Sequence, residues 1–220
     1  MSRTLRIRVV GPQQSWGTRS RFDLRDTEVA PTKSGIVGLV AAAMGLPRGA
    51  GVGHLAALRM GVRIDRPGVR MEDYHTTLDV VDSEGKPSKD AVVSQRAYLS
   101  DAAFLVGLEG DAALLEEIQA SLLDPHWPLA LGRRSFAPSM PVAFSADTDP
   151  EPLVDEALEP GLVACAPVVQ RATEGSVRYL IEDPRGEQEW FDQPVDDFTK
   201  RTFAPRRVKV LEVGWGQTWF

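Results

Sequence analysis

The chain has 220 residues, 43% of them hydrophobic and 25% charged, which is enough apolar content for a sizeable core in one or two domains. No apolar run approaches the ~20 residues of a membrane span, and no signal-type segment precedes the first alternating stretch. A single cysteine, Cys165, excludes an internal disulfide, and three scattered histidines argue against a zinc site. We therefore expect a cytoplasmic protein without a metal or other cofactor.

Charge is distributed unevenly along the chain, whose net charge is −6. Residues 1–100 hold 15 basic and 10 acidic side chains, whereas residues 101–220 hold 10 and 21. This asymmetry favours a basic surface for phosphates and an acidic surface that faces elsewhere. Arginine outnumbers lysine 20 to 5, which suits bidentate phosphate contacts, although a genome rich in G and C would produce the same bias.

The first part of the chain predicts a strand, two helices and a second strand. Alternating apolar residues predict a strand over 5–10, ended by Gly11-Pro12. A polar loop over 13–31 follows and contains Trp16, Arg19, Arg21 and Arg25. Helical spacing predicts a helix over 34–44, capped by Thr32 or Ser34, then a short helix near 54–58 and a strand over 60–64.

The next elements complete a βαββαβ order. We predict a strand over 102–108, a helix over 112–123 and a final strand near 140–144. This order is typical of an α+β fold of the ferredoxin-like, RRM-type class, with two helices on one face of a sheet. We place this domain at residues 1–145 and expect residues 146–220 to form a β-rich region packed on it, with strand candidates at 162–169 and 178–181.

An insertion of about 35 residues, 67–101, separates the second and third predicted strands, where a short turn would suffice. The stretches Thr76–Val81 and Ala91–Val93 flank a polar tip, which predicts a long projecting β-hairpin. Its side chains able to touch RNA are Tyr74, His75, Lys86, Lys89, Arg96 and Tyr98.

Two short segments have the composition of phosphate sites. In Leu131-Gly-Arg-Arg-Ser135, two guanidiniums and the Ser135 hydroxyl suit phosphate oxygens, or the segment is an exposed basic turn with surface ion pairs. In Pro31-Thr-Lys-Ser-Gly35, a helix N-terminus and Lys33 favour an anion, or this is an ordinary helix cap with a solvated lysine.

Tyr74 and His75 have the composition of a general acid–base pair for metal-free RNA cleavage. A histidine beside an aromatic residue more often has a structural role. No nucleophile triad, zinc motif, dinucleotide fingerprint or paired-carboxylate spacing is present.

Five segments, in this order, resemble the CasD-type subunits of type I-E CRISPR Cascade, in the RAMP superfamily. They span residues 11–17, 31–46, 73–78, 95–104 and 131–135, across roughly the first 145 residues. The resemblance implies an RRM-like domain with a hairpin thumb and a smaller C-terminal β region.

The resemblance also implies a role: a non-catalytic subunit that holds the 5′ handle of the crRNA. Such a subunit packs against the backbone and large subunits and meets target DNA only within the complex. The predicted RNA-binding residues are Arg133, Arg134, Ser135, Lys33, Ser34, Arg96, Arg19, Arg21, Tyr74 and His75. The predicted strands lack the aromatic pattern of an RRM, so we expect RNA on loops, helix termini and the hairpin.

The alternative is a metal-independent endoribonuclease that processes precursor crRNA, as in type I-C relatives. It would need a general base beside the attacking 2′-hydroxyl. Tyr74, His75 and Lys33 are the candidate groups.

Overall fold

The computed structural model describes residues 3–18, 24–81, 84–86, 91–145, 150–170, 175–200 and 202–214. Its strands are β1 (Arg3–Val10), β2 (Gln13–Gln14), β3 (Leu24–Arg25), β4 (Arg59–Arg66), β5 (Val69–Thr77), β6 (Val92–Ser100), β7 (Ala103–Gly110), β8 (Leu153–Val154), β9 (Ser176–Glu182), β10 (Gln188–Pro194) and β11 (Phe203–Gly214). Its helices are α1 (Lys33–Ala43), α2 (Gly53–Ala56), α3 (Ala112–Leu123) and α4 (Leu158–Val163). The mixed α+β class is confirmed.

The main sheet has seven strands in the order β10-β11-β9-β4-β7-β1-β8, and neighbouring strands are antiparallel. In its middle, β4, β7 and β1 have the order expected of the second, third and first strands of a βαββαβ sandwich. The predicted fourth strand, 140–144, is wrong: Ala143 forms an isolated bridge with Ile7. Pro141 lacks the N–H that a regular ladder would need at this position.

One face of this sheet packs against α1 and α3. Leu5, Ile7 and Val9 alternate along β1 toward this face, and they join the buried side chains of the two helices in one core. Thr32 caps α1 by accepting a hydrogen bond from the backbone N–H of Gly35 at 3.2 Å. The helices predicted from apolar spacing are therefore confirmed.

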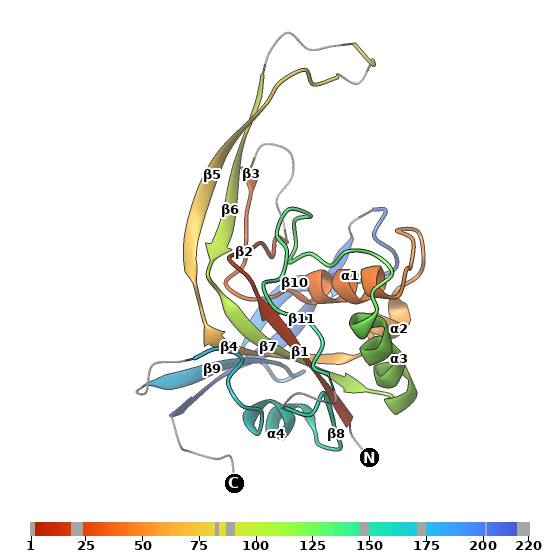
Figure 1. Ribbon diagram of the computed structural model, residues 1–220, viewed down its shortest axis with the longest axis vertical. Helices are drawn as coiled ribbons and strands as arrows, with labels where there is room; N and C mark the ends of the chain where they lie inside the picture. The colour runs from red at the N-terminus through yellow and green to blue at the C-terminus, as the bar shows by residue number, and fades with distance from the viewer. Residues whose placement is uncertain are drawn as a thin grey trace.

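The opposite face is covered by α4, which the sequence did not predict (Figure 1). Leu158 and Leu162, one turn apart, lie on Gly61 and Gly107, where an added Cβ would come within 2.8 Å and 2.7 Å of these leucines. The predicted strand over 162–169 is wrong, because carbonyls of this segment accept hydrogen bonds from the buried Arg63 guanidinium, not from a neighbouring strand.

The C-terminal strands extend the same sheet. β9 pairs with β4, and β11 lies between β9 and β10. The strand predicted at 178–181 lies within β9. The β-rich character expected of residues 146–220 thus takes the form of added strands, without a second sheet of their own in the described ranges.

The inserted hairpin, which we call the thumb (residues 67–101), rises from the body as a long antiparallel pair of β5 and β6 (Figure 1). The predicted hairpin is confirmed, with its strands closer to the body than expected. Asp79 has a positive φ of 54°, so β5 ends before the apolar residues that suggested a longer strand. Gly68 has φ of 72°, and a Cβ at this position would lie 2.5 Å from the Ser100 carbonyl oxygen. Because glycine has no Cβ, the chain can bend here and the thumb can leave β4 and β7.

β2 and β3 pair with β6 to complete a second, four-stranded sheet at the thumb base. Helices in the described part of the chain are all too short to cross a membrane.

Candidate nucleic-acid interface

The loop that contains the two neighbouring arginines is fixed by its backbone. The Ser15 N–H donates to the Leu131 carbonyl at 3.0 Å, and the Phe136 N–H donates to the Arg133 carbonyl at 2.9 Å. Gly132 has φ of 94°, and a Cβ at this position would lie 1.8 Å from the Ser15 carbonyl oxygen. Only glycine fits this approach, so the arginines project from a rigid turn.

Arg133 lies half-buried where this loop meets the thumb. Its Nη2 donates to the Ala97 carbonyl of β6 at 2.7 Å, and its guanidinium lies over the Phe136 ring, 5.3 Å from the centroid. Burial lowers the pKa of Arg133, and the nearby charges of Arg96 and Arg25 lower it further. Arg96 and Arg25 thus lie close enough to add positive potential at Arg133.

Strand pairing explains how these arginines meet. Arg25 of β3 is in register with Arg96 of β6, and Arg96 donates from Nε to the Ser94 hydroxyl at 2.9 Å. Across the hairpin, Asp73 of β5 stands opposite Arg96 and is the carboxylate that partly offsets the positive charge at Arg133. We call Arg25, Arg96 and Arg133 the thumb-base cluster.

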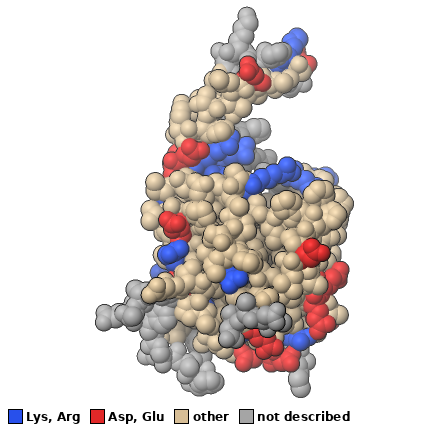
Figure 2. All heavy atoms as spheres, in the orientation of Figure 1, with Lys and Arg blue, Asp and Glu red and all other residues tan. Residues whose placement is uncertain are grey.

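Figure 2 shows Lys and Arg side chains gathered where the thumb meets the body and continuing over the upper surface of the body. Acidic side chains on this face gather mainly at its lower edge, and some also lie directly beside the basic side chains at the thumb base. A surface with this separation of charge attracts a polyanion to the thumb base.

Arg134 and Ser135 are exposed beside the cluster. Within the described ranges the Arg134 side chain makes no hydrogen bond or ion pair, and Arg133 makes no ion pair. The interpretation of this segment as a turn stabilised by surface ion pairs therefore lacks support.

The predicted phosphate site at the start of α1 is wrong. Lys33 is only 1% exposed, and its Nζ donates to both carboxylate oxygens of Glu182 at 2.9 and 2.8 Å. Its backbone N–H donates to Asp192 at 2.7 Å, so a carboxylate of the protein already occupies the helix N-terminus. Arg206 in turn holds Asp192. Ser34 is buried too, so neither residue is available to RNA.

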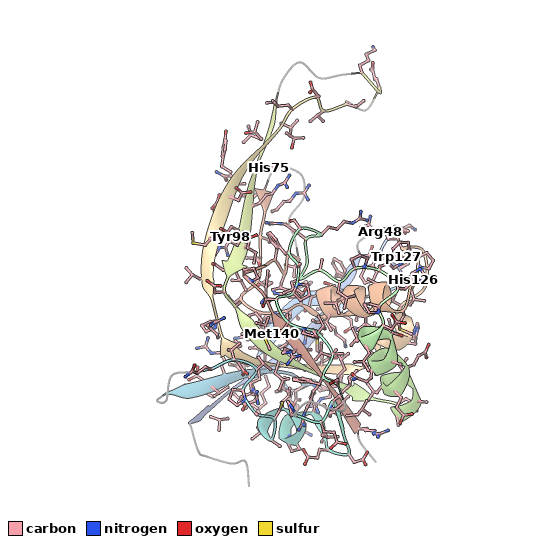
Figure 3. The ribbon with its side chains drawn as sticks, viewed as in Figure 1. Arg48, His75, Tyr98, His126, Trp127 and Met140 are labelled. Atoms are coloured by element: carbon pink, nitrogen blue, oxygen red, sulfur yellow. The ribbon has the colours of Figure 1, made fainter. Side chains whose placement is uncertain are left out.

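Tyr74 and His75 lie on the thumb, where Figure 3 labels His75. Tyr74 is opposite Gln95 and His75 is opposite Ser94, so their side chains leave β5 toward opposite faces. Tyr74 is 68% exposed and available to a ligand. Arg19 and Arg21 lie outside the described residues.

Sequence reasoning missed Arg25 as a site residue, although it noted the loop that contains it. Its pairing partner lies 71 positions away on β6, and β3 has only two residues. Such a short parallel pair leaves no periodic signal in the sequence.

The fold and the thumb define the class of this protein. The family model described as "CRISPR-associated protein (Cas_Cas5)" matches residues 4–209. The chain belongs to this Cas5 family, and the resemblance found in five sequence segments is confirmed.

Three relatives place the chain more closely. It is 33% identical over 147 residues to the CRISPR system Cascade subunit CasD of Escherichia coli K12, covering 59% of this chain and 64% of that protein, less than two thirds of its length. A solved structure titled "Crystal structure of Cas protein" is 42% identical, with a TM-score of 0.76 over 96% of this chain and 95% of that one. Another, titled "CRISPR RNA-guided surveillance complex", is 31% identical, with a TM-score of 0.78 over 96% and 90%.

Proposed function

We propose that this chain is a non-catalytic RNA-binding subunit of a type I-E CRISPR surveillance complex (Cascade) and holds the 5′ handle of the crRNA. The observation that carries this proposal is the thumb-base cluster, in which Arg25, Arg96 and Arg133 converge with Asp73 as the opposing charge. A phosphate that binds among them offsets their positive charges, and charge-assisted hydrogen bonds to arginine are strong.

The architecture favours the thumb base over the sheet as the RNA surface. An RRM binds RNA across an open sheet face. Here α1 and α3 cover one face of the main sheet and α4 covers the other. The rigid turn at Gly132 instead presents Arg134 and Ser135 to solvent next to the cluster.

The relatives support the same role. One is named as a Cascade subunit, and another comes from an RNA-guided surveillance complex. By this analogy the partners are crRNA and the backbone and large subunits, with target DNA bound only within the assembled complex.

The geometry gives little support to the endoribonuclease alternative. Cleavage would need a base and an acid on the same scissile group. Tyr74 and His75 leave β5 on opposite faces, and Lys33 is held in a buried ion pair with Glu182. These three groups therefore do not converge.

Replacing Arg133 and Arg134 together with alanine tests the proposal. We expect the full-length variant to bind single-stranded RNA of its own CRISPR repeat at least about 100-fold more weakly, since each of the two charge-assisted contacts contributes roughly 1.5–3 kcal/mol. A fluorescence-anisotropy titration measures the affinity, and co-purification with the other subunits measures assembly.

The matched control replaces Arg178 and Arg185, two exposed arginines on and after β9, and removes the same charge. This control should bind RNA like the unchanged protein. If both double variants lost RNA affinity equally, only net charge would matter. Unchanged RNA affinity after loss of Arg133 and Arg134 would contradict the proposed site.

A further inference from the structure

A large aromatic side chain lies exposed on the body, outside the thumb-base cluster. Trp127 follows α3 and is 53% exposed. Most tryptophans bury far more of their surface, and exposed ones mark places where an apolar ring meets a ligand or partner. Figure 3 shows Trp127 with His126 and Arg48 on one side of the body, beyond the end of α1.

The backbone beneath this ring is fixed. The N–H groups of His126 and Trp127 donate to the carbonyls of Ala43 and Ala42, at 2.9 and 3.3 Å. These carbonyls belong to the last turn of α1, where the Ala42 carbonyl also accepts from the Gly45 N–H at 3.2 Å. The segment is therefore anchored to a core helix and holds Trp127 in place.

His126 supports the indole from the side. Its ring lies on Gly45, where an added Cβ would come within 2.8 Å of the imidazole. The His126 and Trp127 rings meet edge to face, with centroids 4.8 Å apart and an interplanar angle of 83°. A ring that is both exposed and immobilised loses little conformational freedom when it binds another ring.

Figure 3 shows an arginine on the same side of the body as this ring. Arg48 follows Gly45 by three residues, is exposed, and makes no side-chain hydrogen bond or ion pair within the described ranges. Arg133 comes six residues after Trp127, so the two α-carbons lie within about 20 Å of each other. One extended RNA strand can reach both places.

We propose that Trp127, supported by His126, stacks an unpaired base of the same RNA strand whose phosphates bind Arg133 and Arg134, while Arg48 binds a neighbouring phosphate. This inference rests on the proposed function and adds a base-binding position to it. Aromatic side chains stack on any base, so the position fixes the path of the strand without selecting its sequence.

A protein partner is the competing occupant, because tryptophan is also frequent at protein interfaces. Arg48 and Arg134 make no ion pair with any residue that the structure describes, which favours a phosphate-bearing strand. Leu123 provides a way to separate the two, since it is 53% exposed at the end of α3 and offers an apolar contact but no ring.

The test uses the full-length chain and single-stranded repeat RNA with 2-aminopurine placed at successive positions. Trp127→Ala should weaken binding about 5- to 150-fold, the range found for loss of one base stack. It should also remove the fluorescence quenching at one position of the RNA. Trp127→Phe should keep most of the affinity, whereas Trp127→Leu should behave like alanine and Leu123→Ala like the unchanged protein.

Salt dependence separates stacking from charge. Trp127 variants should keep the slope of log affinity against log salt, and Arg48→Ala should reduce its magnitude by about 0.7. Urea unfolding should show that all these variants are folded, because the replaced side chains are exposed. If Trp127→Ala perturbs the turn, the comparison of Trp127→Phe with Trp127→Leu still tests stacking.

Unchanged affinity and quenching in Trp127→Ala would overturn the inference while leaving the proposed function intact. The inference would also be overturned if Trp127→Leu bound RNA as tightly as Trp127→Phe. Loss of subunit co-purification in both Trp127→Ala and Leu123→Ala, with RNA affinity unchanged, would assign the surface to a protein partner. Failure of the unchanged chain to bind RNA would overturn the proposed function itself.

Discussion

Gly132 shows how one residue without a side chain positions two charged neighbours. The backbone at this position nearly touches the Ser15 carbonyl, with the residue at positive φ. The close approach is to the backbone of the same chain, at the residue that follows β2. Arg133 and Arg134 depend on this contact for their direction.

Replacing Gly132 with alanine should destabilise the protein by at least about 2 kcal/mol, because a Cβ has no room against a backbone oxygen. RNA affinity should fall as well, although no charge is removed. Urea unfolding and an RNA titration measure the two effects. Gly51→Ala is the control, since nothing lies within 4 Å of a Cβ there, and a variant of Gly132 as stable as this control would contradict the account.

Lys33 marks the limit of sequence reasoning at the residue scale. The start of α1 and its cap could be predicted from local residue types. The partners of Lys33 could not, because Glu182 and Asp192 lie 149 and 159 positions away. Burial lowers the pKa of this lysine, and its contribution is to join α1 to the C-terminal strands.

At the scale of elements, periodicity located α1, α3, β1, β4 and β7 within a few residues of their bounds. The thumb could be predicted because an insertion of its length needs its own structure. The C-terminal strands were harder to place, since β9 pairs with a strand more than 100 positions earlier. α4 was missed because it is short and buries only two leucines on glycines of the sheet.

A chain that ends at residue 145 should fail to fold cooperatively. It would leave the edge of β4 unpaired and the buried Lys33 without Glu182. Arg63 would keep Asp65 but lose its carbonyl partners at Leu162 and Cys165. Uncompensated buried charges and open strand edges favour collapsed, aggregating states. Near-ultraviolet circular dichroism and urea unfolding check this, and a sharp cooperative transition would show that residues 1–145 are an independent domain.

Across the whole molecule, the fold places positive charge at the thumb base in a way that the order of charges along the sequence does not show. The thumb-base cluster draws Arg25, Arg96 and Arg133 from three distant segments. The acidic side chains of the C-terminal part were expected to form a surface that faces away from phosphates. Two of them, Glu182 and Asp192, instead form ion pairs with Lys33 and Arg206 inside the protein. The net charge of −6 therefore says little about the surface offered to RNA.

The most direct measurement is incubation of the purified chain with its own repeat RNA in EDTA, analysed on native and denaturing gels together. The account predicts an RNA that is shifted on the native gel and intact on the denaturing gel, with a shift that weakens as salt rises because phosphates are neutralised. A specific cut in the RNA would contradict the account and make this chain a processing nuclease. The absence of any shift would show that the isolated chain does not bind RNA.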